Sequence, residues 1–274
     1  MTALKLSDSV SKKHAIFPFF KDGHPINSGQ KWGMTLKSSG SMRFRWNEEN
    51  PLRKKTLSEI ASLERAVAHQ RKIASVELIH SKDVLVIENE NDIWQKCADG
   101  IITKNRDIMP VVTVADCVPL YFFDSKTNAF GIVHSGWKGT GIAEKAIALM
   151  AENFSTSTDE LCVAIGAHIH ECCYIVNQER AHFFKTTFSP ICVLPVKDNE
   201  ECVSKIKWNY GEGGAFRLSL LKANLFLLKK CGIRDENIVI LDECTCCNET
   251  FGSNRRQSAN GEPAFTVQAA FVLV

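Results

Sequence analysis

The chain has 274 residues, of which 45% are hydrophobic and 23% are charged, and its formal net charge is +2. This composition is typical of a globular protein and excludes disordered, collagen-like and coiled-coil classes. Basic and acidic residues nearly balance, 33 against 31, so the chain shows no basic excess of the kind that binds nucleic acid or an anionic membrane. The length allows one or two domains. Because no linker or repeat interrupts the sequence, we expect a single domain over residues 1–274, present as a monomer or homodimer.

Eleven cysteines are present, an odd number that cannot all pair within one chain. The apolar run at residues 15–20 is too short for a signal peptide, and no stretch approaches the ~20 apolar residues of a membrane span. We therefore expect a cytoplasmic chain with reduced thiols, which serve as core residues, metal ligands or catalysts. A disulfide scaffold is excluded.

The predicted elements alternate between strands and helices. Residues 1–55 show weak periodicity, and Thr56-Leu57-Ser58-Glu59 then resembles a capping box that opens an amphipathic helix reaching about Arg71. A second helix is expected at 139–153, and a third at 218–230 that ends before Gly232. Strands are expected at 73–79, 84–88, 110–115, 118–124, 129–134, 161–166, 238–241 and 265–274. Adjacent strands with inserted helices favour a mixed α/β sheet over strict βαβ alternation.

Three good zinc ligands stand near the ends of predicted strands: His80, Cys117 and His134. Two imidazoles and one thiolate form a catalytic type of zinc set, which leaves a fourth position for water or substrate. Each residue taken alone also fits a packed histidine or an inert core thiol. Asp116, beside Cys117, is a candidate for proton transfer or for orienting the ligand, and equally for capping a strand end.

The turn 136–141 and the pair Arg255-Arg256 are candidate phosphate sites. Lys138 and the amides at a helix N-terminus would suit an anion, although the turn is neither a Walker loop nor a dinucleotide fingerprint. Its glycines also fit a tight connection between a strand and a helix. Arg255 and Arg256 would clamp phosphate in bidentate fashion or form a solvated basic turn.

Two clusters of thiols remain, Cys172-Cys173 and Cys244-Thr245-Cys246-Cys247, and they would form a structural zinc site if the fold joined them. Adjacent cysteines on a strand point to opposite faces, which favours core packing instead. His168 and His170 fit either a second metal site or a surface turn. Eight histidines with one close pair are sparse for several coppers, and no GxSxG elbow supports a serine hydrolase.

Four ordered motifs carry a family resemblance. They are ADCVPL at 115–120, HSGWKG at 134–139, IGAHIHECCY at 165–174, and CTCCNETF with NRR at 244–256. In this order they resemble the YfiH family of laccase-domain proteins, which are labelled polyphenol oxidases and also described as purine nucleoside phosphorylases. The segments 17–23 and 41–47 depart from the family's usual forms, so residues 1–55 are divergent.

The resemblance implies an α+β fold with four layers, α/β/β/α, mixed sheets and a relationship to cytotoxic-necrotizing-factor-type cysteine hydrolases. It implies that His80, Cys117 and His134 bind zinc. It also implies phosphorolysis of adenosine, inosine or methylthioadenosine, together with adenosine deamination.

The leading hypothesis is therefore a zinc-dependent enzyme whose partners are a purine nucleoside and phosphate. Cys117, Asp116 and His134 would be catalytic, and Lys138, Arg255 and Arg256 would hold phosphate. Bound zinc lowers the pKa of a water toward ~7, the chemistry that zinc deaminases use at C6 of adenine. The alternatives are a cysteine hydrolase that uses Cys117 and His134 without metal, and a non-catalytic metal-binding interaction protein. A copper polyphenol oxidase is the least favoured.

Overall fold

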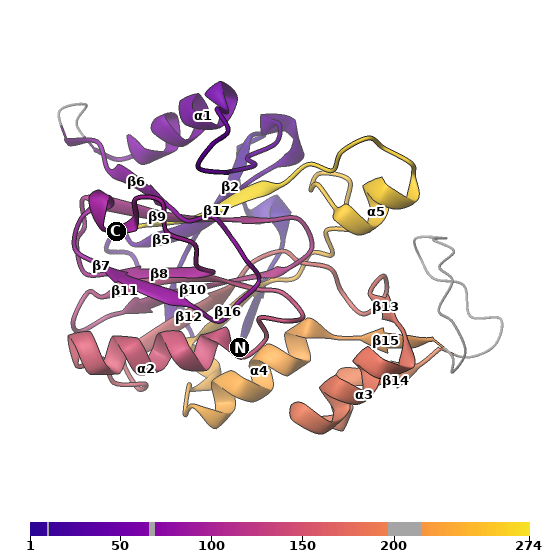
Figure 1. Ribbon diagram of the computed structural model, residues 1–274. Coiled ribbons are helices and arrows are strands. Elements are labelled where there is room, and N and C mark those ends of the chain that lie inside the picture. Colours follow the sequence, from indigo (N-terminus) through magenta and orange to yellow (C-terminus); the bar gives the residue numbers. More distant parts are fainter. Residues whose placement is uncertain (10, 66–68, 197–214) are drawn as a thin grey trace.

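Two mixed β-sheets pack against each other in the computed structural model, which describes residues 1–274 except 10, 66–68 and 197–214 (Figure 1). Within these residues the larger sheet has seven strands in the order β1-β16-β12-β10-β11-β8-β7. Antiparallel pairs occupy its centre, and parallel pairs occupy both edges. The strands are β1 Thr2–Leu4, β7 Val84–Ile87, β8 Gly100–Thr103, β10 Val118–Asp124, β11 Phe130–Ser135, β12 Leu161–Ile165 and β16 Ile238–Leu241.

The second sheet pairs strands from the N-terminal region with the last strand of the chain. Its order is β2-β5-β17-β9-β6, with only the β6–β9 pair parallel. The strands are β2 His14–Pro18, β5 Lys31–Thr35, β6 Lys72–Ser75, β9 Ile108–Val114 and β17 Gln268–Leu273. Two small sheets complete the strands: β3 Phe20–Lys21 with β4 His24–Pro25, and β13 Ile175–Val176 with β14 Val193–Pro195 and β15 Phe216–Leu218.

Helices cover the outer faces of both sheets (Figure 1). α1 packs on β9 and β17 of the five-stranded sheet, and α2 and α4 pack on the seven-stranded sheet. The helices are α1 Pro51–Ala61, α2 Ile142–Phe154, α3 Gln178–Thr187, α4 Leu220–Lys230 and α5 Asn254–Ala259. No helix among the described residues is long and apolar enough to cross a membrane.

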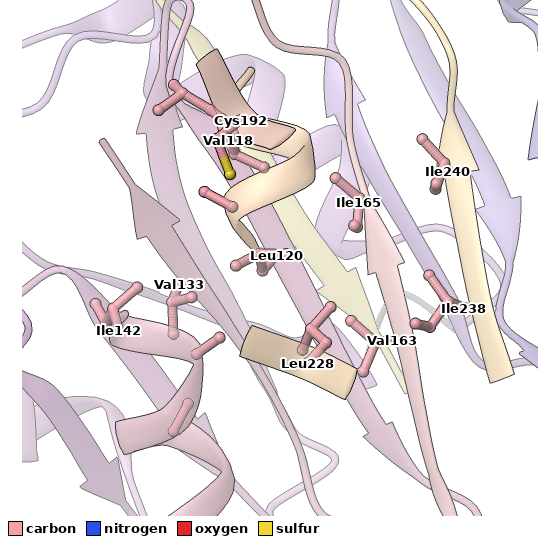
Figure 2. Close-up of a cluster of buried hydrophobic side chains, with 14 of the residues drawn as sticks. Val118, Leu120, Val133, Ile142, Val163, Ile165, Cys192, Leu228, Ile238 and Ile240 are labelled. Carbon is pink, nitrogen blue, oxygen red and sulfur yellow. The ribbon is translucent and has the colours of Figure 1, made fainter. Parts of the chain in front are cut away.

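The central strands are buried on both faces, which explains their continuous apolar runs. Along β10, Leu120 and Phe122 point to the helices, whereas Tyr121 and Phe123 point to the other sheet. Figure 2 shows the helix-facing cluster, in which side chains from β10, β11, β12 and β16 gather with Ile142 of α2 and Leu228 of α4. The labelled residues are Val118, Leu120, Val133, Ile142, Val163, Ile165, Cys192, Leu228, Ile238 and Ile240.

The predicted mixed α/β fold is confirmed, and most predicted elements from residue 84 onward occur within a few residues of their expected bounds. Sequence patterns missed the strands before residue 55, together with β8, β13, β14, β15, α3 and α5. The strand expected at 73–79 ends at Ser75, so His80 lies in a loop.

The first helix was placed wrongly. It begins at Pro51 instead of Thr56, because the Asn50 side chain accepts a hydrogen bond from the Arg53 amide and proline suits the first helical position. Thr56 is therefore buried inside the helix, which ends at Ala61 and not near Arg71. The side chain of Arg71 instead donates to the backbone carbonyls of Ala61, Leu63 and Val274.

Phe271 tests the packing of α1 on the five-stranded sheet. It is fully buried at the centre of β17, so Phe271→Ala should lower the free energy of unfolding by ~3–5 kcal/mol, measured by urea denaturation. Phe265→Ala removes a ring that is 39% exposed and should cost less than ~0.5 kcal/mol. Equal losses for the two variants would contradict this packing.

Candidate active site

The structure brings together His80, Cys117 and His134. One ligand atom from each of the three lies within 4.8 Å of the others. His80 belongs to the loop after β6, Cys117 to the bend between β9 and β10, and His134 to β11. Three segments that are remote in sequence therefore supply one group of donors.

Strand pairing explains the proximity of Cys117 to His134. β10 and β11 are antiparallel, with Val118 opposite Ser135 and Pro119 opposite His134. Cys117 therefore stands just before the paired end of β10, next to the end of β11 that carries His134. The hairpin of β10 and β11 therefore brings together two side chains that are far apart in the sequence.

A buried carboxylate, Asp99, connects the other two segments. Its Oδ1 accepts hydrogen bonds from His134 Nδ1 and from the His80 amide, each at 3.0 Å. Its Oδ2 accepts from the amide and hydroxyl of Ser81, at 2.6 and 2.9 Å. The backbone of Asp99 contributes as well, because its carbonyl accepts from the His134 amide at 2.7 Å.

This arrangement fixes the tautomer of His134. An ionised carboxylate only accepts hydrogen bonds, so Nδ1 carries the proton and Nε2 is the ring atom available to a ligand. Burial would raise the pKa of Asp99, but the hydrogen bonds from His134 and Ser81 lower it below its ordinary value. Asp99 therefore remains a carboxylate at neutral pH.

Asp99 also holds a strained loop. His80 has φ of 59°, a left-handed conformation that is uncommon for a residue with a side chain. The carboxylate accepts from the amides on both sides of this residue as well as from its own. One side chain thus compensates for the strain in the segment that presents His80.

Charges at the three donors are coupled. Burial lowers the pKa of His134, but the charge of the Cys117 thiolate and the hydrogen bond to Asp99 outweigh it and raise that pKa to about 10. His80 responds in the opposite direction, because burial and the neighbouring charge of His134 lower its pKa. These shifts favour a protonated His134 beside a neutral His80 when no metal is bound.

The glycine-rich turn after β11 is shaped by close approach. A Cβ at Gly136 would lie 3.1 Å from Cys117 Sγ, and one at Gly139 would lie 2.7 Å from the Ser81 carbonyl oxygen. Gly141 has φ of +110° and caps α2. These glycines let the turn pass beside the donors, and Lys138 within it is exposed.

Aromatic and cationic side chains contact each other beside the glycine-rich turn 136–141. The Arg180 guanidinium lies 4.1 Å from the ring centroid of Trp137, and its Nη1 donates to the Tyr174 hydroxyl at 3.3 Å. Burial raises the pKa of Tyr174, and the charge of Cys117 adds to the effect. Tyr174 is therefore near enough to the donor group to sense its charge.

Hydrogen bonds from neighbouring groups hold the Asp116 carboxylate. Oδ1 accepts from the Thr245 hydroxyl and Oδ2 from the Arg255 amide in the first turn of α5, both at 2.7 Å. Burial raises the pKa of Asp116 to about 6 against these hydrogen bonds. The carboxylate therefore links α5 to the bend that carries Cys117, instead of capping a strand.

The two arginines expected to bind phosphate occupy different settings. Arg255 donates from Nη1 to the carbonyls of Cys173 and Ile175, and its guanidinium lies 5.3 Å from the Tyr174 ring centroid. Arg256 donates to the carbonyls of Thr245, Cys246, Asn248 and Phe251. Neither arginine belongs to a solvated turn.

His168 does not lie on a surface turn either. Its side chain is fully buried and its Nδ1 lies 2.8 Å from the Gly166 carbonyl oxygen. Burial lowers the pKa of His168 to about 3. Neither His168 nor His170 belongs to a group of metal-ligating side chains in the described part of the chain.

Sequence reasoning missed Asp99, Tyr174 and Arg180. Asp99 precedes the unpredicted strand β8, so no pattern indicated that it would meet His134. Tyr174 lies within a quoted motif, but its role depends on a contact with α3. Only the tertiary structure reveals these neighbours.

The molecule is thus a mixed α/β protein with a His–Cys–His donor group supported by a buried carboxylate. A family model described as "Multi-copper polyphenol oxidoreductase laccase" matches residues 52–269, and the chain belongs to this family. The family resemblance of the four motifs is confirmed.

The curated relatives are named either purine nucleoside phosphorylase or adenosine deaminase. The chain is 31% identical over 161 residues to "Purine nucleoside phosphorylase YlmD" of Geobacillus stearothermophilus, covering 58% of this chain and 54% of that protein. It is 28% identical to "Purine nucleoside phosphorylase LACC1" of Homo sapiens, covering 74% and 44%. It is 27% identical to "Adenosine deaminase RL5" of an unknown prokaryotic organism, covering 68% and 71%. The chain thus spans about half the length of the first two relatives.

Solved structures share the fold. The crystal structure of YlmD from Geobacillus stearothermophilus has a TM-score of 0.72 and 24% identity, covering 93% of this chain and 95% of the other. The structure of the Bacillus licheniformis hypothetical protein YfiH has the same TM-score with 21% identity, covering 89% and 92%.

Asp99→Asn tests the buried network. The amide group would place a donor against the N–H and O–H groups that the carboxylate accepts, so we expect a loss of ~1–3 kcal/mol in the free energy of unfolding. Asp83→Asn, an exposed change near the same loop, should cost less than ~0.5 kcal/mol. Urea denaturation measures both, and a neutral Asp99→Asn would contradict the network.

Proposed function

We propose that the chain is a zinc-dependent enzyme that acts on purine nucleosides. The reactions would be phosphorolysis of adenosine, inosine or methylthioadenosine, and deamination of adenosine. The convergence of His80, Cys117 and His134 on one point, with His134 oriented by Asp99, carries the proposal. The names of the relatives supply the substrate class.

The donors fit zinc in number and in kind. Three protein ligands of nitrogen and sulfur leave a fourth position open, as in catalytic zinc sites, and the Asp99–His134 pair is a carboxylate–histidine arrangement typical of them. Bound zinc would act as a Lewis acid and lower the pKa of a water in the open position. His80 and His134 would bind through neutral imidazole, and Cys117 through its thiolate.

Asp116 would hold the proton that moves during the reaction. Its pKa of about 6 is close to the operating pH, which favours general acid–base catalysis. Its hydrogen bonds to Thr245 and Arg255 also fix the bend that carries Cys117. In this proposal the same carboxylate positions a ligand and exchanges a proton.

Lys138 and Arg255 would hold phosphate. Lys138 is exposed in the turn before α2, close enough to His80 for its charge to lower that residue's pKa. Phosphorolysis requires negative charge to be held against a cationic ribose, so positioned cations lower the barrier. Arg256 already donates to four backbone carbonyls, so we assign it to the loop and not to phosphate.

A cysteine hydrolase is the second candidate because Cys117, His134 and Asp99 also follow the order of nucleophile, base and orienting carboxylate. His80 distinguishes the zinc enzyme from the cysteine hydrolase. A zinc site uses His80 as a ligand, whereas a nucleophilic thiol with His134 as its base does not need a second imidazole. A copper polyphenol oxidase has no comparable geometric support. A non-catalytic metal-binding protein would use the same donors, and the turnover assay below separates it from an enzyme.

Removing each donor tests the leading proposal. His80→Ala, Cys117→Ala and His134→Ala should each lower turnover of adenosine and inosine by at least ~100-fold and release zinc from this site, because two ligands cannot hold the ion in place. Mass spectrometry of the products, with and without phosphate, and metal analysis of the same samples measure both effects.

His24→Ala, which removes an exposed imidazole outside the donor group, is the matched control and should leave both unchanged. Full activity of His80→Ala after loss of its zinc would overturn the zinc mechanism and favour the cysteine hydrolase. Copper in place of zinc after purification would overturn the choice of metal.

Lys138→Ala should separate the two reactions. Without the cation we expect phosphorolysis to fall by ~10-fold or more, whereas deamination, which uses no phosphate, should change little. The exposed Lys145→Ala on α2 serves as the control. An equal loss in both reactions would remove Lys138 as a phosphate ligand.

A further inference from the structure

Four thiols form a second cluster. The Sγ atoms of Cys172, Cys173, Cys244 and Cys247 all lie within 4.8 Å of one another. None of the described cysteines is paired in a disulfide. These thiols come from two of the family motifs, and no proposed step of the nucleoside chemistry uses them.

The sulfur distances match a tetrahedral metal site. With Zn–S bonds of about 2.3 Å, the edges of a ZnS₄ tetrahedron are about 3.8 Å long. The Cys172 sulfur lies 3.7, 3.7 and 3.6 Å from those of Cys173, Cys244 and Cys247. The Cys173–Cys247 distance is shorter, at 3.2 Å, and still exceeds the ~2.05 Å of a disulfide.

Local backbone geometry makes the cluster possible. The expectation that neighbouring cysteines diverge assumes a strand, but residues 171–173 form a turn, so both sulfurs reach one side. Cys244 and Cys247 are separated by two residues, a spacing common in zinc sites. They stand in a second turn, closed by the Asn248 amide donating to the Cys244 carbonyl at 2.9 Å.

Donors and cations surround the sulfurs. The His170 amide donates to Cys244 Sγ at 3.4 Å, a contact suited to a thiolate. Three arginine side chains donate hydrogen bonds to backbone carbonyls of the two turns. Arg217 donates to the carbonyl of Cys172, and Arg255 donates to that of Cys173. Arg256 donates to the carbonyls of Thr245 and Cys246. Four thiolates around a divalent cation carry two net negative charges, which nearby arginines would offset.

We propose that Cys172, Cys173, Cys244 and Cys247 bind one zinc ion in a closed tetrahedral site, distinct from the His80–Cys117–His134 site. Binding converts the four thiols to thiolates and releases their protons, with no change of oxidation state. All four positions are filled by sulfur, so this ion is structural. Cys246, whose sulfur lies outside the group of four, is not a ligand.

The ion would clamp the turn 171–173 to the turn 244–247. Thr245, between two of the ligands, donates to Asp116, and Asp116 precedes Cys117. Arg255 bonds the first turn through Cys173 and donates its amide to the same carboxylate. The structural zinc therefore positions the bend that carries Cys117 without touching the substrate.

Zinc content of the full chain tests the proposal. Plasma mass spectrometry on protein dialysed against metal-free buffer should find two zinc ions per wild-type chain and one in Cys247→Ser. Because Cys247 is exposed, its substitution should spare the packing of the core. His134→Ala should also keep one zinc, and the double variant should keep none.

Two further variants sharpen the test. Cys247→His supplies a new ligand in a Cys₃His set and should restore the second zinc. Cys246→Ser changes a thiol in the same turn and should keep both ions. Cobalt in place of zinc should give the intense thiolate charge-transfer bands of a tetrathiolate site in wild type and in His134→Ala, but not in Cys247→Ser.

One zinc per wild-type chain, unchanged in Cys247→Ser, would overturn the structural site. A disulfide between any of the four cysteines, detected by the mass of the alkylated protein, would also overturn it. Neither result depends on nucleoside turnover, so a failure here is distinguishable from a failure of the proposed enzyme activity.

Discussion

The buried carboxylate of Asp99 is the constraint on which the candidate active site depends. Its side chain accepts hydrogen bonds from the loop of His80 and from the His134 ring, while its carbonyl accepts from the His134 amide. A buried carboxylate is costly unless its oxygens are satisfied, so these segments stabilise the charge and the charge in turn orders them. The geometry of two donor side chains is thereby set before any ligand binds.

Strand pairing in the seven-stranded sheet also helps to position the donor side chains. The β10–β11 hairpin fixes Cys117 beside His134, and hairpin register is rigid where both faces of the strands are buried. Gly136 then lets the following turn pass over the donors at a distance that a Cβ would obstruct. Rigid strands and one buried carboxylate together hold the three donors in place, which the proposed metal site would require.

The sequence predicted the elements that have a continuous apolar pattern, and it singled out His80, Cys117 and His134 from residue chemistry. It did not predict Asp99, because a lone aspartate before a short strand has no periodic signal. The start of α1 was misplaced because two capping signals competed and Asn50-Pro51 prevailed over Thr56. The thiol cluster was less favoured because strand geometry sends neighbouring side chains to opposite faces, whereas Cys172 and Cys173 lie in a turn and their sulfurs belong to one group.

The donor chemistry bears on the copper named in the family description. Copper(II) favours nitrogen-rich, tetragonal sites, and several coppers would need many imidazoles. The described residues gather two imidazoles with one cysteine sulfur, and separately four cysteine sulfurs. His168, which would be needed to extend an imidazole set, is buried with its Nδ1 turned to a backbone carbonyl oxygen. Three nitrogen and sulfur donors in one group and four sulfur donors in the other suit the two zinc sites proposed above better than several coppers.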